Sequence, residues 1–219
     1  MRRPITLFIL SIFLRSTIAL HVSIYYAALC SDSVDFITQQ LYPHYEELKD
    51  HLTIDFIPYG KTMHGYNARI QKYIFNCQHG VLECNANTYQ ACALAQANDQ
   101  DSKVKFVNCV MSARNPAKIS AIKKCVIDRG LDFDKVQTCT KSSEGEQLQV
   151  INGNKTWTLE PNIYEVPTVI LNGDNHINGN TQARALADFT ALVCSNLEEP
   201  KPEVCQKKGL LRKIKDYFS

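Results

Sequence analysis

Cys30 is the residue whose type and position point most clearly to chemistry. The chain of 219 residues has nine cysteines, and an odd number leaves at least one thiol without a partner inside the chain. Cys30 lies in the turn between an alternating apolar stretch and a helical pattern, where the unpaired N–H groups and the dipole of a helix N-terminus stabilise a thiolate. We predict that Cys30 is a free nucleophile; the alternative is that it forms half of an ordinary disulfide.

Ser33 stands three residues after Cys30, in the sequence Cys-Ser-Asp-Ser. Thiol–disulfide exchange needs one thiolate to attack a disulfide and a second thiol to displace the mixed disulfide that results. A serine hydroxyl cannot perform the second step. An exposed Cys30 thiol would also permit a disulfide-linked dimer of the chain.

The remaining eight cysteines are predicted to form four structural disulfides, because a secreted chain meets an oxidising environment. They are Cys77, Cys84, Cys92, Cys109, Cys125, Cys139, Cys194 and Cys205. Sequence alone does not choose among their possible pairings. Two pairs look local, namely Cys109 with Cys125 and Cys194 with Cys205.

Zinc binding is the competing interpretation for Cys77, Cys84 and Cys92, because His79 lies among them. Their separations of seven and eight residues differ from those of paired Cys-x2-Cys zinc ligands, and an oxidising compartment favours disulfides. We therefore expect no metal site. His79 either titrates near neutral pH and tunes the local charge, or makes a structural hydrogen bond.

Hydrophobic periodicity predicts the elements that position these residues. Residues 21–26 alternate and predict a strand, and residues 52–56 predict a second one. Between them, apolar positions from Val34 to Leu48 recur every three or four residues and predict a helix of about five turns, kinked at Pro43. A helix of this length between two strands is typical of the crossover in a parallel βαβ unit.

The rest of the chain adds helices and one more strand region. From about residue 67 to 136 no strand is expected, and we interpret this stretch as a helical insert. Residues 164–171 predict a strand, Asn172-Gly173 a hairpin turn, and residues near 176–178 the partner strand. A last amphipathic helix is expected to bury Ala183, Leu186, Phe189 and Val193. This order of elements predicts an α/β protein with a thioredoxin-like fold and a disulfide-rich helical insertion.

Residues 1–19 are predicted to be a signal peptide. They begin with two arginines, continue with an apolar run far shorter than the ~20 residues of a membrane-spanning helix, and end in small residues near Ala19. Removal of this segment, which holds three arginines and no acidic residue, changes the formal net charge from +2 to −1 and leaves no overall charge argument for nucleic-acid binding. Asn154 begins the one Asn-x-Ser/Thr sequon, which predicts a glycan on a surface loop. Together with the cysteine count, these signs predict a protein of the secretory pathway without stable membrane insertion.

Residues 206–219 predict a basic amphipathic tail after a folded domain of residues 20–205. The tail places Lys207, Lys208, Arg212, Lys213 and Lys215 around Leu210, Leu211, Ile214 and Phe218 at helical spacing. Such a tail can touch an anionic membrane; the alternative is a solvated helix or a removable extension.

The segment from Cys77 to Cys92 reads Cys-Gln-His-Gly-Val-Leu-Glu-Cys-Asn-Ala-Asn-Thr-Tyr-Gln-Ala-Cys. It resembles, residue for residue, the Cys-Gln-His-Gly-x2-Glu-Cys-x2-Asn-x4-Cys signature of the interferon-inducible lysosomal thiol reductase family. The stretch that ends at Cys30, and Val166-Pro167 followed by Asn-Gly, are also similar to that family. The resemblance therefore covers nearly all of the mature chain.

The resemblance implies a thioredoxin-like enzyme that reduces protein disulfides at acidic pH, and we expect no cofactor. It also implies a cis bond between Val166 and Pro167 beside the redox site, where the neighbouring backbone groups would bind an extended substrate. The sequence departs from the family at the redox site itself. Where the family has Cys-x-x-Cys, this chain has Cys30 followed by Ser33. Three hypotheses follow from this departure: a monothiol reductase resolved by an external small thiol such as cysteine or glutathione, a protein that captures its partners covalently, or a family member that has lost catalysis and serves as a binding protein. Together with the predicted signal peptide, the resemblance implies a secreted or lysosomal address.

Overall fold

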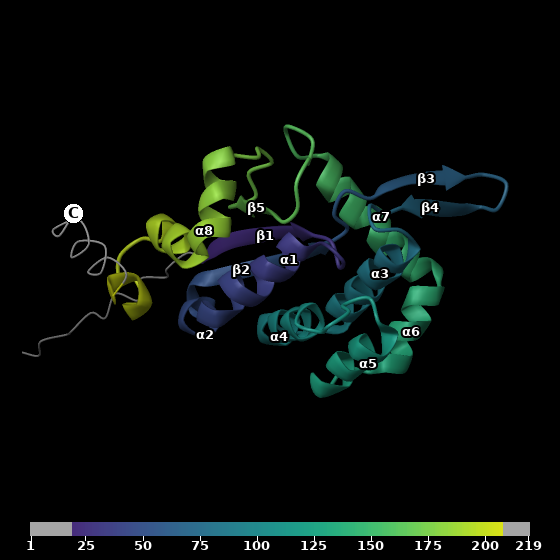
Figure 1. Cartoon of the computed structure of the whole chain (residues 1–219), viewed down its shortest axis with the longest axis horizontal. Helices are drawn as coiled ribbons and strands as arrows, with labels where there is room; N and C mark the ends of the chain where they lie inside the picture. Colours follow the sequence, from purple (N-terminus) through teal and green to yellow (C-terminus); the bar gives the residue numbers. More distant parts are fainter. Residues whose placement is uncertain (1–18, 208–219) are drawn as a thin grey trace, which may run out of the picture.

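A three-stranded sheet in the order β2–β1–β5 forms the centre of the structure (Figure 1). The computed structural model describes residues 19–207, so the expected signal peptide up to residue 18 and the basic tail from residue 208 lie outside the described residues. Within the described range, no helix has the length and apolar character needed to cross a membrane.

The central strand is β1 (Leu20–Tyr26), and both of its faces are covered. It pairs in parallel with β2 (Leu52–Pro58), with Leu20 opposite Leu52, and antiparallel with β5 (Thr168–Leu171). Val22, Ile24 and Tyr26 are fully buried in the larger core cluster, whereas Tyr25 belongs to a smaller cluster on the other face. The predicted alternation of β1 is confirmed.

The crossover from β1 to β2 is helical throughout but changes its winding along its length. Its segments are α1 (Ser31–Asp35), the π-helical η1 (Phe36–Leu41), the 3-10 turn η2 (Tyr42–His44), α2 (Tyr45–Leu48) and the 3-10 turn η3 (Lys49–His51). Pro43 lies in η2, where its missing N–H interrupts the regular ladder. The kink predicted at this proline is confirmed.

Five helices and a hairpin separate β2 from β5. The hairpin consists of β3 (Met63–Asn67) and β4 (Lys72–Asn76), and the helices are α3 (Val81–Gln96), α4 (Gln100–Met111), α5 (Ile119–Asp128), α6 (Phe133–Lys141) and α7 (Ser143–Trp157). The expectation of no strand after residue 67 is therefore wrong, because β4 pairs with β3. The insert also continues past residue 136 through α7, whose two glycines weaken the helical signal.

Two predictions near the C-terminal end of the fold need correction. Asn172 and Gly173 have φ of 55° and 70°, as the predicted turn requires, but no partner strand follows within the described residues. The backbone there pairs instead with Glu160, which donates to Asn175 and accepts from Ile177.

The last helix, α8 (Gly179–Asn196), is bent at Asp188, whose backbone is not helical. The buried stripe runs through Ala185, Phe189 and Val193, at intervals of four residues. Phe189 and Val193 are buried as predicted, but Ala183 and Leu186 are exposed.

Asn154 lies in α7 rather than on the expected loop, although its side chain is exposed. The sequon reaches the surface from a helix because its neighbours turn inward, with Gly153 and Thr156 buried. The surface position was predicted correctly and the loop was not.

Four disulfides cross-link the fold, and all nine cysteines of the chain lie in the described part. The pairs are Cys77–Cys84, Cys92–Cys139, Cys109–Cys125 and Cys194–Cys205. Both predicted local pairs are confirmed. The third pair joins α4 to α5, and the fourth ties α8 to the segment that follows it. Cys30 is the remaining free thiol, as predicted.

Candidate active site

Cys30 is the N-cap residue of α1. Its extended backbone, with φ −78° and ψ 120°, turns the chain from the end of β1 into the helix. The Cys30 N–H donates to the Ala27 C=O at 3.2 Å, and the Val34 N–H donates to the Cys30 C=O at 3.0 Å. The half-buried thiol is therefore held at the start of a helical crossover, where the sequence placed it.

The loop before β5 brings Val166 and Pro167 against this thiol. The Cys30 Sγ–H donates to the Val166 C=O at 3.3 Å, although the two residues are 136 positions apart. The Val166–Pro167 bond is cis, as the family resemblance implied. The two residues expected to bind substrate thus stand beside the nucleophile.

Ser33 lies behind Cys30 and not at the surface. Its side chain is fully buried, and its Oγ accepts a hydrogen bond from the Ala27 N–H at 3.4 Å. Cys30 and Ser33 both belong to the first turn of the helix, so their side chains lie on the same side of it. The hydroxyl occupies the place that a second thiol would take.

A cleft of about 340 Å³ opens at Cys30. Three distant segments and α8 line it: Leu29, Cys30, Ser31 and Asp32; Lys61, Gln78 and His79; Glu165, Val166 and Pro167; and Leu186. The candidate nucleophile, the cis-proline loop and part of the cysteine-rich signature therefore share one cleft. The exposure of Leu186, which the helical pattern did not predict, is explained by its place in the cleft wall.

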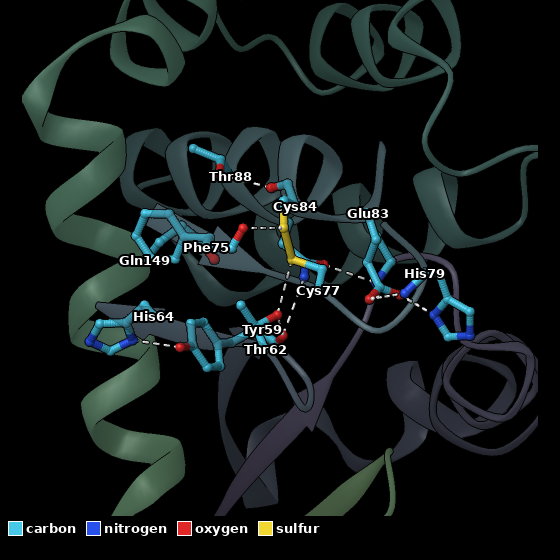
Figure 2. Close-up of a disulfide and its surroundings, with 12 residues drawn as sticks. Tyr59, Thr62, His64, Phe75, Cys77, His79, Glu83, Cys84, Thr88 and Gln149 are labelled. Atoms are coloured by element: carbon cyan, nitrogen blue, oxygen red, sulfur yellow. Dashed lines mark hydrogen bonds and ion pairs between the residues drawn. A yellow bond between two sulfur atoms is a disulfide. The ribbon is translucent and has the colours of Figure 1, made fainter. Parts of the chain in front are cut away.

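The signature segment forms a closed loop between β4 and α3. The Cys77–Cys84 disulfide closes it, and the Thr62 Oγ–H lies 3.1 Å from Cys77 Sγ on its inner side (Figure 2). Gly80 caps α3 with φ 79°, a left-handed conformation that favours glycine. This conformation aims the preceding residues, Gln78 and His79, at the Cys30 cleft.

His79 is fixed by a buried carboxylate. Its Nδ1 lies 2.5 Å from Glu83 Oε2, and its backbone N–H donates to Glu83 Oε1 at 3.2 Å (Figure 2). Glu83 is 1% exposed, so its carboxylate oxygens depend on these contacts for hydrogen-bond partners. Of the two interpretations of His79, the structure favours the hydrogen-bonding one.

Two further residues of α3 hold the end of β1, and the sequence analysis assigned them no role. Buried Asn87 accepts from the Ala28 N–H at 2.9 Å and donates to the Tyr59 C=O at 3.3 Å. Buried Gln90 accepts from the Tyr26 hydroxyl at 2.7 Å. The sequence offered one signal for these contacts: Asn87 and Gln90 are amides in an alanine-rich helix, and a buried amide needs hydrogen-bond partners.

The described residues offer no cluster of three or more His, Cys, Asp or Glu side chains that could hold a metal ion. Cys77, Cys84 and Cys92 are each bonded to another cysteine, so they have no thiolate to offer zinc.

Comparison with known proteins identifies the family. The sequence model described as "Gamma interferon inducible lysosomal thiol reductase (GILT)" matches residues 21–129. A "Gamma-interferon-inducible lysosomal thiol reductase-like protein" of Anopheles gambiae is 33% identical over 196 residues, covering 84% of this chain and 79% of that protein. This chain belongs to the GILT family. GILT-like protein 1 of Drosophila melanogaster is 30% identical over 199 residues, covering 85% of this chain and 78% of that protein.

Solved structures agree with the thioredoxin-like fold of this GILT family member. The crystal structure of Chlamydia trachomatis DsbA aligns with a TM-score of 0.50 at 11% identity, covering 97% of this chain and 98% of that one. A putative protein disulfide isomerase from Nitrosomonas europaea gives a TM-score of 0.50 at 12% identity, covering 70% and 84%. At these identities the likeness concerns the fold alone.

Proposed function

We propose that this chain is a thiol oxidoreductase that reduces protein disulfides with Cys30 as its only nucleophile. The observation that carries the proposal is the position of the Cys30 thiol. It is the one free thiol of the chain, and it lines the cleft against the cis Val166–Pro167 bond. Membership in a family named for thiol reduction supports the type of reaction.

The first step is attack of the Cys30 thiolate on one sulfur of a substrate disulfide. The substrate S–S bond breaks, its second sulfur leaves as a thiolate and takes up a proton, and a Cys30–substrate mixed disulfide forms. A small thiol such as cysteine or glutathione then attacks the Cys30 sulfur and releases the second substrate thiol. Another molecule of the small thiol frees Cys30. Overall, two small thiols are oxidised to one disulfide while one substrate disulfide becomes two thiols.

Val166 and Pro167 are proposed to bind the backbone of the substrate. In the free protein the Val166 C=O accepts the hydrogen bond of the Cys30 Sγ–H. Deprotonation of Cys30 removes that donor, so the carbonyl becomes available to an N–H of an extended substrate. The same event thus creates the nucleophile and frees the acceptor that positions its target.

The compartment is proposed to be the secretory pathway, with delivery to lysosomes or export. The lysosomal names of the relatives support this address. The exposed side chain of Asn154 is accessible to a glycan there. Digestion of the expressed protein with an N-glycosidase should lower its mass in the wild type and leave Asn154→Gln unchanged.

Trapping of the mixed disulfide tests the proposed chemistry. The full chain is mixed with a denatured disulfide protein, quenched with acid and analysed by mass spectrometry with peptide mapping. We expect one adduct, joined at Cys30 and absent from Cys30→Ser. An adduct at another cysteine, or no adduct in the wild type, would overturn the assignment of the nucleophile.

Covalent capture of partners without turnover is the second candidate function, and the buried Ser33 hydroxyl is the observation that favours it. The same adduct distinguishes the two. Added cysteine should release the substrate within seconds to minutes if the protein is a reductase, since exchange with an accessible mixed disulfide is rapid relative to hours-long uncatalysed rearrangement. An adduct that survives excess cysteine would favour the capturing protein.

A further inference from the structure

The β3–β4 hairpin projects from the body of the molecule as a two-stranded arm, beyond the ends of α3 and α7 (Figure 1). Its two ends enter the Cys30 cleft. Lys61, two residues before β3, and Gln78 and His79, two and three residues after β4, all line that cleft. The arm is therefore continuous with the place where a substrate disulfide must lie under the proposed function.

The two faces of the arm differ. One face carries four aromatic rings in mutual contact: His64, Tyr66, Tyr73 and Phe75. Tyr66 is 57% exposed, the other three are half-buried, and His64 fixes the arm to the body through Tyr59. On the other face, Met63 and Ile74 are 57% and 51% exposed. Such apolar exposure on a strand is costly unless a partner covers it.

A shallow hollow of about 630 Å³ lies along the outward face. Gly65 is directly opposite Ile74 in the strand register, and Met63 follows on the same face. Because Gly65 has no side chain, and a Cβ placed there would meet nothing within 4 Å, the floor of the hollow is bare backbone between two apolar side chains. Met63 and Ile74 give this part of the hollow an apolar lining, and Arg69 adds a positive charge to it.

The edges of the arm are also unequal. At the edge of β4, the Tyr73 N–H donates to Glu146 of α7 at 2.8 Å, which ties that edge to the body. In the part of the chain that the structure describes, β3 has no strand neighbour other than β4. An extended polypeptide can therefore add to the β3 edge by backbone hydrogen bonds.

The charge of the arm selects the occupant. Residues 61–76 contain Lys61, Arg69 and Lys72 and no acidic residue. We propose that the arm is a docking site for an extended, acidic and apolar segment of an unfolded substrate protein, next to the disulfide that Cys30 attacks. A five-residue strand is ~17 Å long, so the docked segment lies within about five to ten residues of the substrate cysteine. The identity of the occupant as a substrate rests on the proposed function, but its binding does not need the thiol.

Binding is therefore measured without thiol chemistry. The full chain carrying Cys30→Ser is titrated with a labelled protein that has been reduced and carboxymethylated, which keeps it unfolded, adds carboxylates and removes every disulfide. We expect the Met63→Ser/Ile74→Ser double variant to weaken the Kd about tenfold or more, as for the central apolar contacts of an interface. Gly65→Val should weaken it similarly by filling the hollow, while its open surroundings and its strand conformation keep the fold intact. Binding should also weaken with added salt.

Ile127→Ser is the matched control, because Ile127 is 54% exposed on α5, away from the arm (Figure 1). It should keep the wild-type Kd. Wild-type affinity in both arm variants, or no binding by the Cys30→Ser protein, would overturn the docking site. A third result would also overturn it: arm variants that no longer form a concentration-dependent dimer but still bind the unfolded protein. The occupant of the arm would then be a second copy of the chain.

Turnover separates this inference from the proposed function. In the Cys30 protein, the arm variants should lower kcat/KM for a denatured disulfide protein about tenfold and leave the rate on a small aromatic disulfide within about twofold. If binding follows the arm but no variant turns over any disulfide, the proposed function fails and the docking site stands. Equal losses on both substrates would overturn the docking site.

Discussion

Residue 33 is a serine, with an oxygen where a cysteine would have a sulfur. This one atom decides whether a mixed disulfide at Cys30 is resolved inside the chain or by an external thiol. Under the proposed function, Cys30 forms a mixed disulfide with its substrate, and the chain has no second free thiol to resolve it. The buried Ser33 hydroxyl lies in the same helical turn and accepts a hydrogen bond from Ala27. A second thiol at this position would be shielded from solvent and directed toward the same side as Cys30.

Ser33→Cys should therefore restore internal resolution. The sulfur is a weaker acceptor for the Ala27 N–H, and we expect a cost of about 1 kcal/mol in the free energy of unfolding, which the fold tolerates. The Cys30–substrate adduct should become at least about tenfold shorter-lived without added small thiol, as an internal thiol has a high effective concentration. Adduct decay followed by mass spectrometry measures this. Ser33→Ala is the control and should behave as the wild type; equal lifetimes in all three proteins would contradict the idea that only a resolving thiol is missing.

At the scale of elements, the contact between α7 and the hairpin depends on Gly153. A Cβ at this position would lie 2.6 Å from two ring atoms of His64 and 2.8 Å from Tyr59. The His64 ring cannot easily withdraw, because the Tyr59 hydroxyl bonds its Nδ1 at 2.5 Å and Phe75 packs beside it.

Gly153→Ala should consequently destabilise the protein, although alanine favours a helix. The gain in helix propensity is at most about 1 kcal/mol, whereas overpacking costs about 1–3 kcal/mol. We expect a lower midpoint of urea unfolding and faster hydrogen exchange in the β3–β4 hairpin. Gly179→Ala, at the exposed start of α8 where nothing lies within 4 Å, is the control. A Gly153→Ala protein at least as stable as the wild type would show that the ring moves aside.

The hairpin should also make stability depend on pH through His64. Burial lowers the pKa of His64, because it disfavours the charged ring, while burial raises the pKa of Tyr59 to about 12 and keeps that hydroxyl neutral. The unfolded chain then binds more protons at this site than the folded one between the lowered pKa and about 6.5, so stability falls as pH falls through that range. Urea unfolding from about pH 7.5 to about pH 5 should show a smaller loss in His64→Gln than in the wild type. An equal loss of stability between these pH values in the wild type and in His64→Gln would contradict the role of His64.

Which elements the sequence predicts depends on how they are buried. The alternation of Val22, Ile24 and Tyr26 predicts β1, because these side chains share one face of the strand and enter the larger core cluster together. The same logic misses β4, which has no fully buried side chain: its residues alternate between half-buried and exposed. It also fails in the first turns of α8, where Ala185 is buried and Leu186 lines the Cys30 cleft.

The candidate site divides in a similar way. Cys30 and the cis-proline pair are predicted from residue type and from the family resemblance. The buried Asn87 side chain holds the backbone of Ala28 and Tyr59, which are far from it in the sequence. The buried Glu83 carboxylate instead bonds the half-exposed His79, four residues before it. The sequence indicates that buried polar side chains need hydrogen-bond partners, but only the folded structure shows which residues those partners are.

At the scale of the whole molecule, Cys30 is the one cysteine outside the four disulfides. It is therefore the thiol through which two copies of the chain can form an intermolecular disulfide. Under oxidising conditions without small thiols, two chains should join through Cys30, and reductant should separate them. Non-reducing electrophoresis of the wild type and Cys30→Ser checks this. A dimer that persists in Cys30→Ser would mean that one of the four structural disulfides opens in solution.

The dependence of turnover on an external thiol tests the central claim most directly. Reduction of a denatured disulfide protein is followed with and without added cysteine or glutathione, in the wild type and in Cys30→Ser, after subtraction of the rate without protein. The wild type should turn over repeatedly only when a small thiol is present, stop after at most one mixed disulfide per chain without it, and lose all catalysis in Cys30→Ser. Repeated turnover without a small thiol, or equal rates in the wild type and Cys30→Ser, would contradict the account.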